Sequence, residues 1–207
     1  MIGAVEALQR LKEGNQRFVK GLRSIESMTT HTRRDELTGG QTPFAIILGC
    51  SDSRVPAEIV FDQGLGDLFV IRVAGNIVAP SQIGSVEFAA SQFETRLVVV
   101  LGHSQCGAIR ATVDELKRPN AEQSQNIKSI VDRIRPSVEP FKVTELWHDD
   151  DELIEQSMRA NVRASANQLR HGSSLLEKLS DNDGLLIVGA EYSLETGEVI
   201  FFEGLPE

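Results

Sequence analysis

Both cysteines of the chain, Cys50 and Cys106, lie close in sequence to another potential metal ligand. Asp52 follows Cys50 in the segment Cys-Ser-Asp-Ser-Arg, and His103 precedes Cys106 in the segment His-Ser-Gln-Cys-Gly. Two thiolates, an imidazole and a carboxylate form a tetrahedral ligand set suited to zinc. The sulfur ligands argue against magnesium, calcium and manganese. Each residue alone has an ordinary structural explanation, but their coincidence predicts a zinc site made by Cys50, Asp52, His103 and Cys106.

The neighbouring Arg54 leaves two roles open for Asp52. As a fixed fourth ligand, Asp52 would exclude water, and the zinc would contribute folding energy only. Held instead by Arg54 in a bidentate ion pair, the carboxylate would leave the fourth position open and accept a hydrogen bond from the group bound there. A surface ion pair without a role in catalysis is the remaining interpretation of Arg54.

Short apolar runs predict the strands that position these residues. The runs are continuous rather than alternating, which is typical of parallel strands buried on both faces. Cys50 and His103 each follow a glycine at the end of such a run, so both are expected at the carboxyl ends of strands, where open α/β sheets bind ligands. This convergence requires the first and third strands to be neighbours. The predicted strands are residues 44–48, 68–71, 97–101, 185–188 and 199–202.

Helices are predicted between these strands, at residues 83–93, 108–116, 126–134 and 150–179, the last broken at Gly172 with Ser173 or Ser174 as the next cap. Gly197 suits a tight hairpin, which makes the last strand antiparallel to the fourth. Residues 119–125 and 138–148 are polar or contain proline, and we expect surface loops there. The fold class is therefore α/β, with a mostly parallel four-stranded sheet, an antiparallel fifth edge strand and flanking helices.

A long helical arm is expected before the sheet. Ala4, Leu8, Leu11 and further apolar residues recur at helical intervals, and a Gly-Gly pair at residues 39–40 ends the pattern. We predict an N-terminal helical arm over residues 1–40 and a single α/β zinc-binding domain over residues 41–207. The arm packs either on its own domain or across a second subunit, and the sequence leaves both open.

Charge and hydropathy restrict the partners. The chain of 207 residues has 21 Lys and Arg against 30 Asp and Glu, a formal net charge of −9. An acidic chain is a poor match for nucleic-acid phosphates or an anionic membrane. No apolar run approaches the roughly 20 residues of a membrane-spanning helix, and a signal-peptide pattern is missing. Two cysteines are too few for a disulfide framework. We therefore expect a cytoplasmic protein with no nucleic-acid or membrane partner.

The two motifs resemble those of the β-class carbonic anhydrases. Cys50-Ser-Asp-Ser-Arg54 is similar to the Cys-x-Asp-x-Arg signature of that family, and His103-Ser-Gln-Cys-Gly107 to its His-x-x-Cys-Gly signature. Residues 61–69 and 72–76 look like the bacterial branch. The resemblance implies one Zn²⁺ per subunit, and reversible hydration of carbon dioxide to bicarbonate by zinc-bound hydroxide. It also implies a homodimer or a dimer of dimers, with the arm wrapped on a partner.

The resemblance further implies roles for individual residues. Asp52 and Arg54 would be the catalytic pair. Ile47 stands where the bicarbonate-inhibited branch has tryptophan, which favours the open-site type, and Phe88 is commonly tyrosine in relatives. The substrate pocket would be lined by Gln41, Phe69, Ala74, Gly75, Phe88 and Gly107.

Other functions compete with this one. Hydrolysis of carbonyl sulfide or carbon disulfide on the same site and a non-catalytic zinc-binding protein remain alternatives. The Cys-x-x-Cys of thiol oxidoreductases, the Pro-Cys-x-x-Cys of zinc deaminases and the Gly-x-Gly-x-x-Gly of dinucleotide-binding folds are absent from the sequence. Because thiolate ligands make zinc a weaker Lewis acid than neutral ligands do, we expect hydration to run best above neutral pH.

Overall fold

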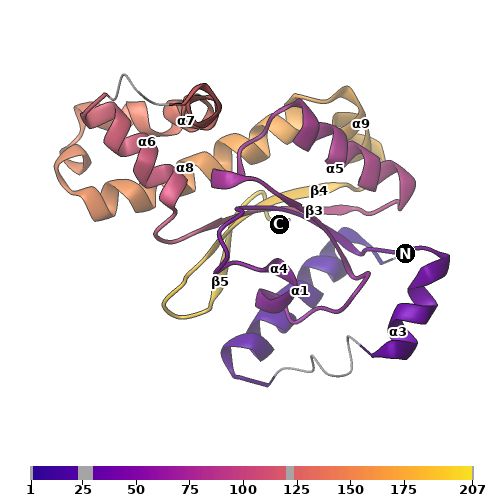
Figure 1. Cartoon of the computed structure of the whole chain (residues 1–207). Coiled ribbons are helices and arrows are strands. Elements are labelled where there is room, and N and C mark those ends of the chain that lie inside the picture. Colours follow the sequence, from indigo (N-terminus) through magenta and orange to yellow (C-terminus); the bar gives the residue numbers. More distant parts are fainter. Residues whose placement is uncertain (1, 23–29, 120–123, 207) are drawn as a thin grey trace.

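Five strands form one sheet: β1 Ala45–Gly49, β2 Leu68–Arg72, β3 Leu97–His103, β4 Leu186–Tyr192 and β5 Val199–Glu203. The structure, a computed structural model, describes residues 2–22, 30–119 and 124–206. The strand order is β2-β1-β3-β4-β5; the first four strands run parallel, and β5 is antiparallel to β4 (Figure 1). The predicted fold class is confirmed, including the antiparallel edge strand and the neighbouring positions of β1 and β3.

The central strands are buried on both faces, as their continuous apolar runs predict. Every residue of β1 and of β3 is buried, and β1 pairs with β3 up to Gly49 opposite Leu101. All five strands end later than predicted: β1, β2 and β5 by one residue, β3 by two, at His103, and β4 by four, at Tyr192. The apolar run of β4 stops before Gly189, but the strand continues with the buried Ala190 and Tyr192 and stays paired with β3, so the run of apolar residues does not show the end of the strand.

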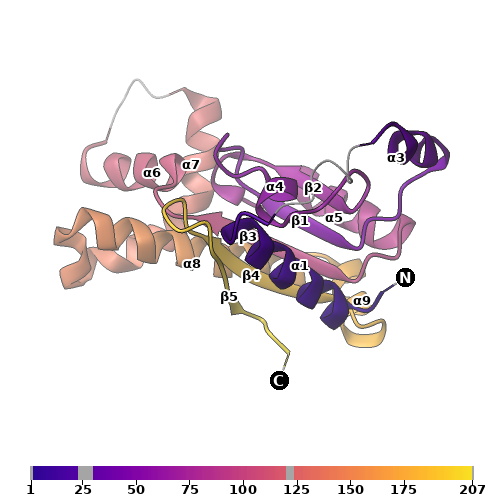
Figure 2. The ribbon, with the colours of Figure 1, turned by 90° about the horizontal axis from the view of Figure 1, so that it is seen from below.

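Two sets of helices cover the two faces of the sheet (Figure 1). α5 and α8 contact the strands directly on one face, and α6, α7 and α9 pack into the same hydrophobic core. α1 and α4 lie on the other face, as Figure 2 shows from below. The bounds are α1 Ala4–Val19, α4 Ala57–Val60, α5 Pro80–Gln92, α6 Gly107–Lys117, α7 Gln125–Val138, α8 Asp150–His171 and α9 Ser174–Asn182.

Capping residues set the bounds of the long helical region at residues 150–182. The Asp149 carboxylate accepts a hydrogen bond from the Glu152 backbone at 3.2 Å, and the acidic first turn of α8 complements the helix dipole. After the break at Gly172, the Ser173 hydroxyl accepts from the Leu176 backbone at 3.1 Å and caps α9. The predicted break is therefore confirmed, with Ser173 as the cap. Among the described helices, none combines the length and apolar character that crossing a membrane requires.

The predicted arm contains α1, the short helix α3 His31–Glu36 and the 3-10 turn η1 Leu37–Gly39. α1 packs on the sheet of its own chain through Ala7, Leu8 and Leu11, which are buried. Gly14 allows α1 to approach the end of α4, because a Cβ there would lie 1.9 Å from the carbonyl oxygen of Phe61, the C-cap of that helix. Residues 23–29 lie outside the described part of the chain, and the division into an arm of residues 1–40 and a domain of residues 41–207 stays a prediction.

The loop expected at residues 138–148 was predicted wrongly. α7 runs to Val138 with Pro136 inside its last turn, and two 3-10 turns follow, η3 Glu139–Val143 and η4 Glu145–His148. Proline marks helix ends in sequence, but near the last turn it removes only one backbone hydrogen bond, so the helix continues past it. Of the other expected loop, residues 120–123 lie outside the described residues, and Ser124 caps α7 through the Asn126 backbone.

Candidate metal centre

Three buried side chains form a cluster at the carboxyl edge of the sheet. The Sγ atoms of Cys50 and Cys106 and a ring nitrogen of His103 lie within 4.8 Å of one another. Cys50 directly follows β1, His103 is the last residue of β3, and Cys106 is the N-cap of α6. The parallel pairing of β1 with β3 therefore brings together two motifs that are 53 residues apart in sequence.

The orientation of the His103 ring favours a metal ion. Nδ1 lies 2.9 Å from the Ser104 carbonyl oxygen, and since a carbonyl can only accept, Nδ1 carries the proton. Nε2 then presents its lone pair to the cluster, where it is buried and has no hydrogen-bond partner among the described residues. Buried polar atoms are rarely left unpaired. A cation that accepts this lone pair would supply the partner that Nε2 lacks. Two sulfur ligands and one nitrogen ligand suit zinc.

The two thiols shift each other's pKa in opposite directions. A hydrogen bond from the Cys106 thiol lowers the pKa of Cys50, and the Gly75 backbone N–H, 3.4 Å from the Cys50 Sγ, acts in the same direction. The same bond to Cys50, together with burial, raises the pKa of Cys106. The first proton therefore leaves this pair more readily than it leaves an ordinary thiol, and a bound cation would displace the second.

Asp52 is held away from the cluster by Arg54. Arg54 Nε donates to Asp52 Oδ1 at 2.9 Å, and Nη2 donates to Oδ2 at 2.8 Å, a bidentate pair. This guanidinium keeps the pKa of the Asp52 carboxyl well below its usual range. Asp52 Oδ2 lies 3.9 Å from His103 Nε2, so the carboxylate is beside the three ligand atoms without being one of their group.

A second arginine contacts the same loop, a role that sequence reasoning missed. Arg72 ends β2 opposite Gly49. Its Nε donates to the Cys50 carbonyl at 3.0 Å, and its Nη2 donates to the Asp52 carbonyl at 2.6 Å. An arginine at the end of an edge strand is an ordinary surface residue by sequence, and only the strand pairing shows that it reaches the loop.

The turn η2 Ala74–Asn76 forms one wall of the cluster. Gly75 has a φ of +68° and lies so close to α7 that a Cβ would come within 2.7 Å of the Ile134 side chain. The buried Asn161 of α8 donates to the Gly75 carbonyl at 2.8 Å and holds the turn in place. Asn161 was another residue that the sequence did not single out, since a polar position within an amphipathic helix shows no partner.

Comparison with known proteins gives the family. A family model described as carbonic anhydrase matches residues 45–199, and solved β-carbonic anhydrases have the same fold. The chain belongs to the β-class carbonic anhydrases. It is 36% identical over 196 residues to carbonic anhydrase 2 of Mycobacterium tuberculosis, covering 95% of this chain and 91% of that protein.

Two solved members of the family show how far the likeness extends. The structure of the β-carbonic anhydrase CcaA is 27% identical with a TM-score of 0.71, and the match covers 95% of each chain. A structure described as a tetrameric β-carbonic anhydrase of Sordaria macrospora has a TM-score of 0.73 at 22% identity, covering 82% of this chain and 85% of that one.

The expected pocket residues of this carbonic anhydrase divide into two groups. Ala74 and Gly75 lie beside Cys50, and Gly107 opens α6 directly after Cys106. These three positions present small residues or backbone around the cluster, as a pocket for a small apolar substrate requires.

The other three expected pocket residues are not brought to the cluster of their own chain. Gln41 precedes β1, and the five residues of that strand put about 16 Å between it and the carboxyl edge. Phe69 pairs with Ile46, three residues or about 10 Å before Gly49. Phe88 is 52% exposed on α5, with its ring 6.3 Å from that of Phe69.

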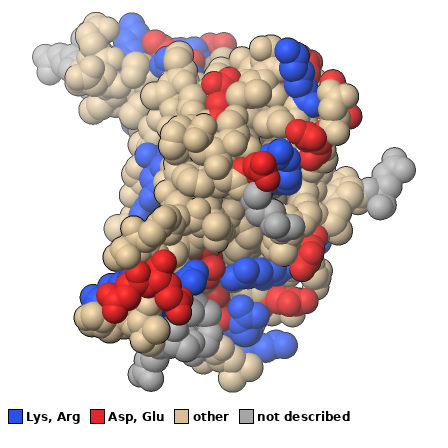
Figure 3. Space-filling model, turned by 90° about the vertical axis from the view of Figure 1, so that its right-hand side faces the viewer, with Lys and Arg blue, Asp and Glu red and all other residues tan. Residues whose placement is uncertain are grey.

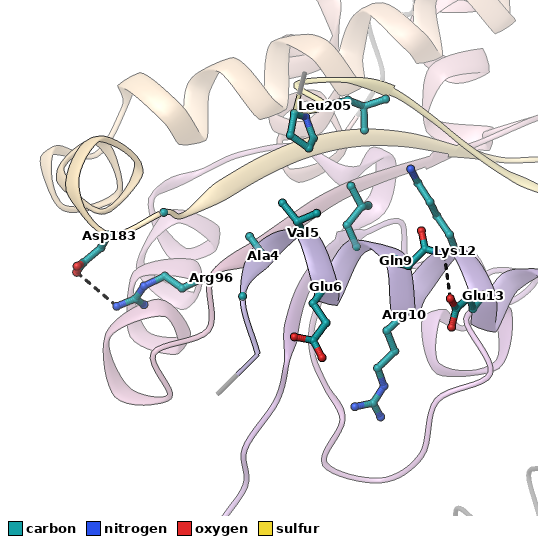
Figure 4. A pocket seen from close by; sticks show the side chains of 14 residues that line it. Ala4, Val5, Glu6, Gln9, Arg10, Lys12, Glu13, Arg96, Asp183 and Leu205 are labelled. Atoms are coloured by element: carbon teal, nitrogen blue, oxygen red, sulfur yellow. Dashed lines mark hydrogen bonds and ion pairs between the residues drawn. The ribbon is translucent and has the colours of Figure 1, made fainter.

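An open groove of about 1120 Å³ lies elsewhere on this carbonic anhydrase (Figure 4). It runs between α1 and the C-terminal segment, near Arg96 and Asp183, which precede β3 and β4 and form an ion pair at 3.5 Å. This is the amino edge of the sheet, opposite the cluster. Its described lining residues include carboxylates but no histidine or cysteine, so the groove has neither the nitrogen nor the sulfur ligands of the cluster.

Proposed function

We propose that this β-carbonic anhydrase catalyses the reversible hydration of carbon dioxide to bicarbonate and a proton at one zinc ion held by Cys50, His103 and Cys106. The unpartnered Nε2 of His103, facing two buried thiols, carries the proposal. Zinc in such a site lowers the pKa of a coordinated water and supplies the nucleophile. Three protein ligands and a fourth position free for solvent are the arrangement of catalytic rather than structural zinc sites.

Asp52 acts as the hydrogen-bond acceptor that orients the nucleophile. Its low pKa keeps the carboxylate ionised and acceptor-only throughout the neutral range. Arg54 occupies one side of both carboxylate oxygens and so opposes a swing of Asp52 onto the fourth position. We propose this open arrangement as the active one, and it argues against a site sealed by Asp52 that serves folding only.

We further propose that two chains form the active unit. β2 is an edge strand, and Phe69, Phe88 and Phe93 form an aromatic patch beside it with ring centroids 5.7 to 6.3 Å apart. Edge strands and exposed apolar patches are typical interfaces. A second copy docked there, as a homodimer or within a dimer of dimers, would bring its own Phe69 and Phe88 toward the cluster. The two zinc-binding thiols suit a reducing compartment, and we place the enzyme in the cytoplasm.

Stopped-flow hydration with a pH indicator tests the reaction on the zinc-loaded protein. We expect rapid proton release with carbon dioxide, and slow or no turnover of carbonyl sulfide and carbon disulfide under the same conditions. Acceleration of either sulfur compound without acceleration of carbon dioxide would assign the site to hydrolysis instead. A zinc-loaded protein that accelerates none of the three would leave only the non-catalytic interpretation.

A further inference from the structure

Arg72 contacts the ligand loop at two points that bracket a single residue. The carbonyl groups of Cys50 and Asp52 both accept hydrogen bonds from its guanidinium, at 3.0 and 2.6 Å, and only Ser51 separates them. The guanidinium is a rigid planar fork, so two bonds to it fix the orientation of both peptide groups together. The residues at the two ends of this stretch, Cys50 and Asp52, provide the sulfur ligand and the carboxylate of the site.

The register of the sheet explains why Arg72 reaches this loop. Arg72 pairs with Gly49, and the Val73 backbone donates to the Gly49 carbonyl at 3.1 Å, so β1 stays in the ladder up to the residue before Cys50. The chain then leaves the sheet, and the Cys50 carbonyl loses its strand partner. The side chain of Arg72 continues the pairing by one residue and returns a donor to that carbonyl.

The two arginines of the site therefore have separate tasks. Arg54 binds the Asp52 carboxylate, whereas the hydrogen bonds of the Arg72 side chain within the described part of the chain go to backbone oxygens of the same loop. The positive charge of Arg72 also lies beside a loop that carries a thiolate and a carboxylate, and charge-assisted hydrogen bonds are about twice as strong as neutral ones.

We propose that Arg72 is a positioning residue of the zinc site, which holds the Cys50–Asp52 backbone in the conformation that binds the metal. This inference rests on the proposed zinc site. Residues that orient metal ligands without touching the metal typically change affinity or activity by about 10- to 100-fold when mutated. Among the described residues, both side-chain hydrogen bonds of Arg72 go to the ligand loop, so its loss acts on the metal site.

The test measures zinc binding by the full chain in four forms: wild type, Arg72→Gln, Arg72→Lys and the control Arg33→Gln. Arg33 is matched to Arg72 in one respect, since its Nε also donates to a backbone carbonyl, that of Leu65 at 3.1 Å. Leu65 precedes β2, whereas Arg72 ends it, so this contact lies at the opposite end of the strand from the cluster; Arg33 also pairs with Asp67 at 3.4 Å. Zinc is removed from each protein and returned in competition with a chelator of known affinity. Melting of the zinc-free proteins and absorption spectra of their cobalt forms are recorded alongside.

We expect Arg72→Gln to bind zinc about 10- to 100-fold more weakly than wild type, with an altered cobalt spectrum and a nearly unchanged melting temperature. The zinc affinity of Arg72→Lys should lie between those of wild type and Arg72→Gln, because an ammonium group can reach one carbonyl but not both. Arg33→Gln should bind zinc as wild type does.

Wild-type zinc affinity and cobalt spectrum in Arg72→Gln would overturn the inference while leaving the proposed function intact. Equal losses in Arg72→Gln and Arg33→Gln would also overturn it. If Arg72→Gln does not fold, Arg72→Lys decides, and wild-type affinity there contradicts the inference. A wild-type chain that binds no zinc would instead remove the proposed function, and this inference with it.

Discussion

At the scale of single residues, the site depends on the orientation of two side chains. One backbone carbonyl sets the tautomer of the His103 ring, and one guanidinium sets the position of the Asp52 carboxylate. Both partners come from within two residues of the group that they orient. The local sequence therefore contains the information for the ligand set and for the pair beside it.

Replacement of Asp52 by asparagine tests the acceptor role. Asp52→Asn keeps the shape but loses the charge that binds Arg54, and we expect kcat/KM for hydration to fall on the order of 100-fold with zinc content unchanged. The control is Asp151→Asn, since the Asp151 side chain is 95% exposed and pairs weakly with Arg110 at 3.8 Å. Stopped-flow measurements give the hydration rates, and metal analysis gives the zinc content. Full activity in Asp52→Asn would contradict the acceptor role of Asp52.

The depressed pKa of Asp52 also predicts a pH dependence of stability. Because the folded-state pKa lies below the ordinary value of 3.8, the pair stabilises the fold above that pH and loses its effect as the pH falls through the folded value. In urea denaturation of the zinc-free proteins, wild type should exceed Asp52→Asn in stability near pH 6. The difference should shrink below about pH 4. A constant difference across this range would show that Asp52 is not linked to the fold in this way.

At the scale of elements, the carboxyl ends of β1 and β3 and the turn after β2 form the centre. The turn η2 lies between Cys50 and α7, and its Gly75 supplies an N–H to the sulfur. The turn therefore needs a residue that tolerates a positive φ and has no side chain.

Gly75→Ala tests this requirement. A methyl group there would meet the Ile134 side chain at 2.7 Å in a left-handed conformation, and we expect a loss of about 1–3 kcal/mol in the free energy of unfolding. Gly84→Ala in α5 is the control, because nothing lies within 4 Å of its new Cβ; it should be neutral or stabilise by up to about 1 kcal/mol. Denaturant titration measures both, and equal stability of Gly75→Ala and wild type would contradict the packing described.

Much of this arrangement could be predicted from the sequence, and the exceptions have physical reasons. The buried strands are apolar throughout, so β1 and β3 were found, and with them the meeting of Cys50 and His103. The helix past Pro136 was missed because tertiary packing outweighs one lost hydrogen bond. The roles of Arg72 and Asn161 were missed because both act on backbone oxygens, and a backbone acceptor leaves no mark on sequence.

At the scale of the molecule, the surface is acidic overall, with basic and acidic side chains interspersed on the face in Figure 3. The aromatic patch of Phe69, Phe88 and Phe93 borders the edge strand β2, and its Phe88 is 52% exposed. Gln41 precedes β1 and Phe69 lies within β2, both away from the carboxyl edge of the sheet, so the proposed pocket that includes them would need a partner chain.

Phe88→Asp tests the proposed interface. A buried charge would disfavour association, and we expect a shift toward monomers in sedimentation velocity together with a fall in hydration rate per zinc. Ile127→Asp on α7 is a matched control, because Ile127 and Phe88 are each 52% exposed and Ile127 lies outside the patch. Equal shifts toward monomers in Phe88→Asp and Ile127→Asp, or no shift in either, would place the interface elsewhere.

Our central claim is that one metal ion, bound by Cys50, His103 and Cys106, activates water in this chain. Its most direct test is the hydration rate of the zinc-free protein as zinc is returned in known amounts. We predict no activity without metal, a linear rise that ends at one zinc per chain, and no comparable rise in Cys106→Ser. Full activity in the zinc-free protein, or in Cys106→Ser without bound metal, would contradict it.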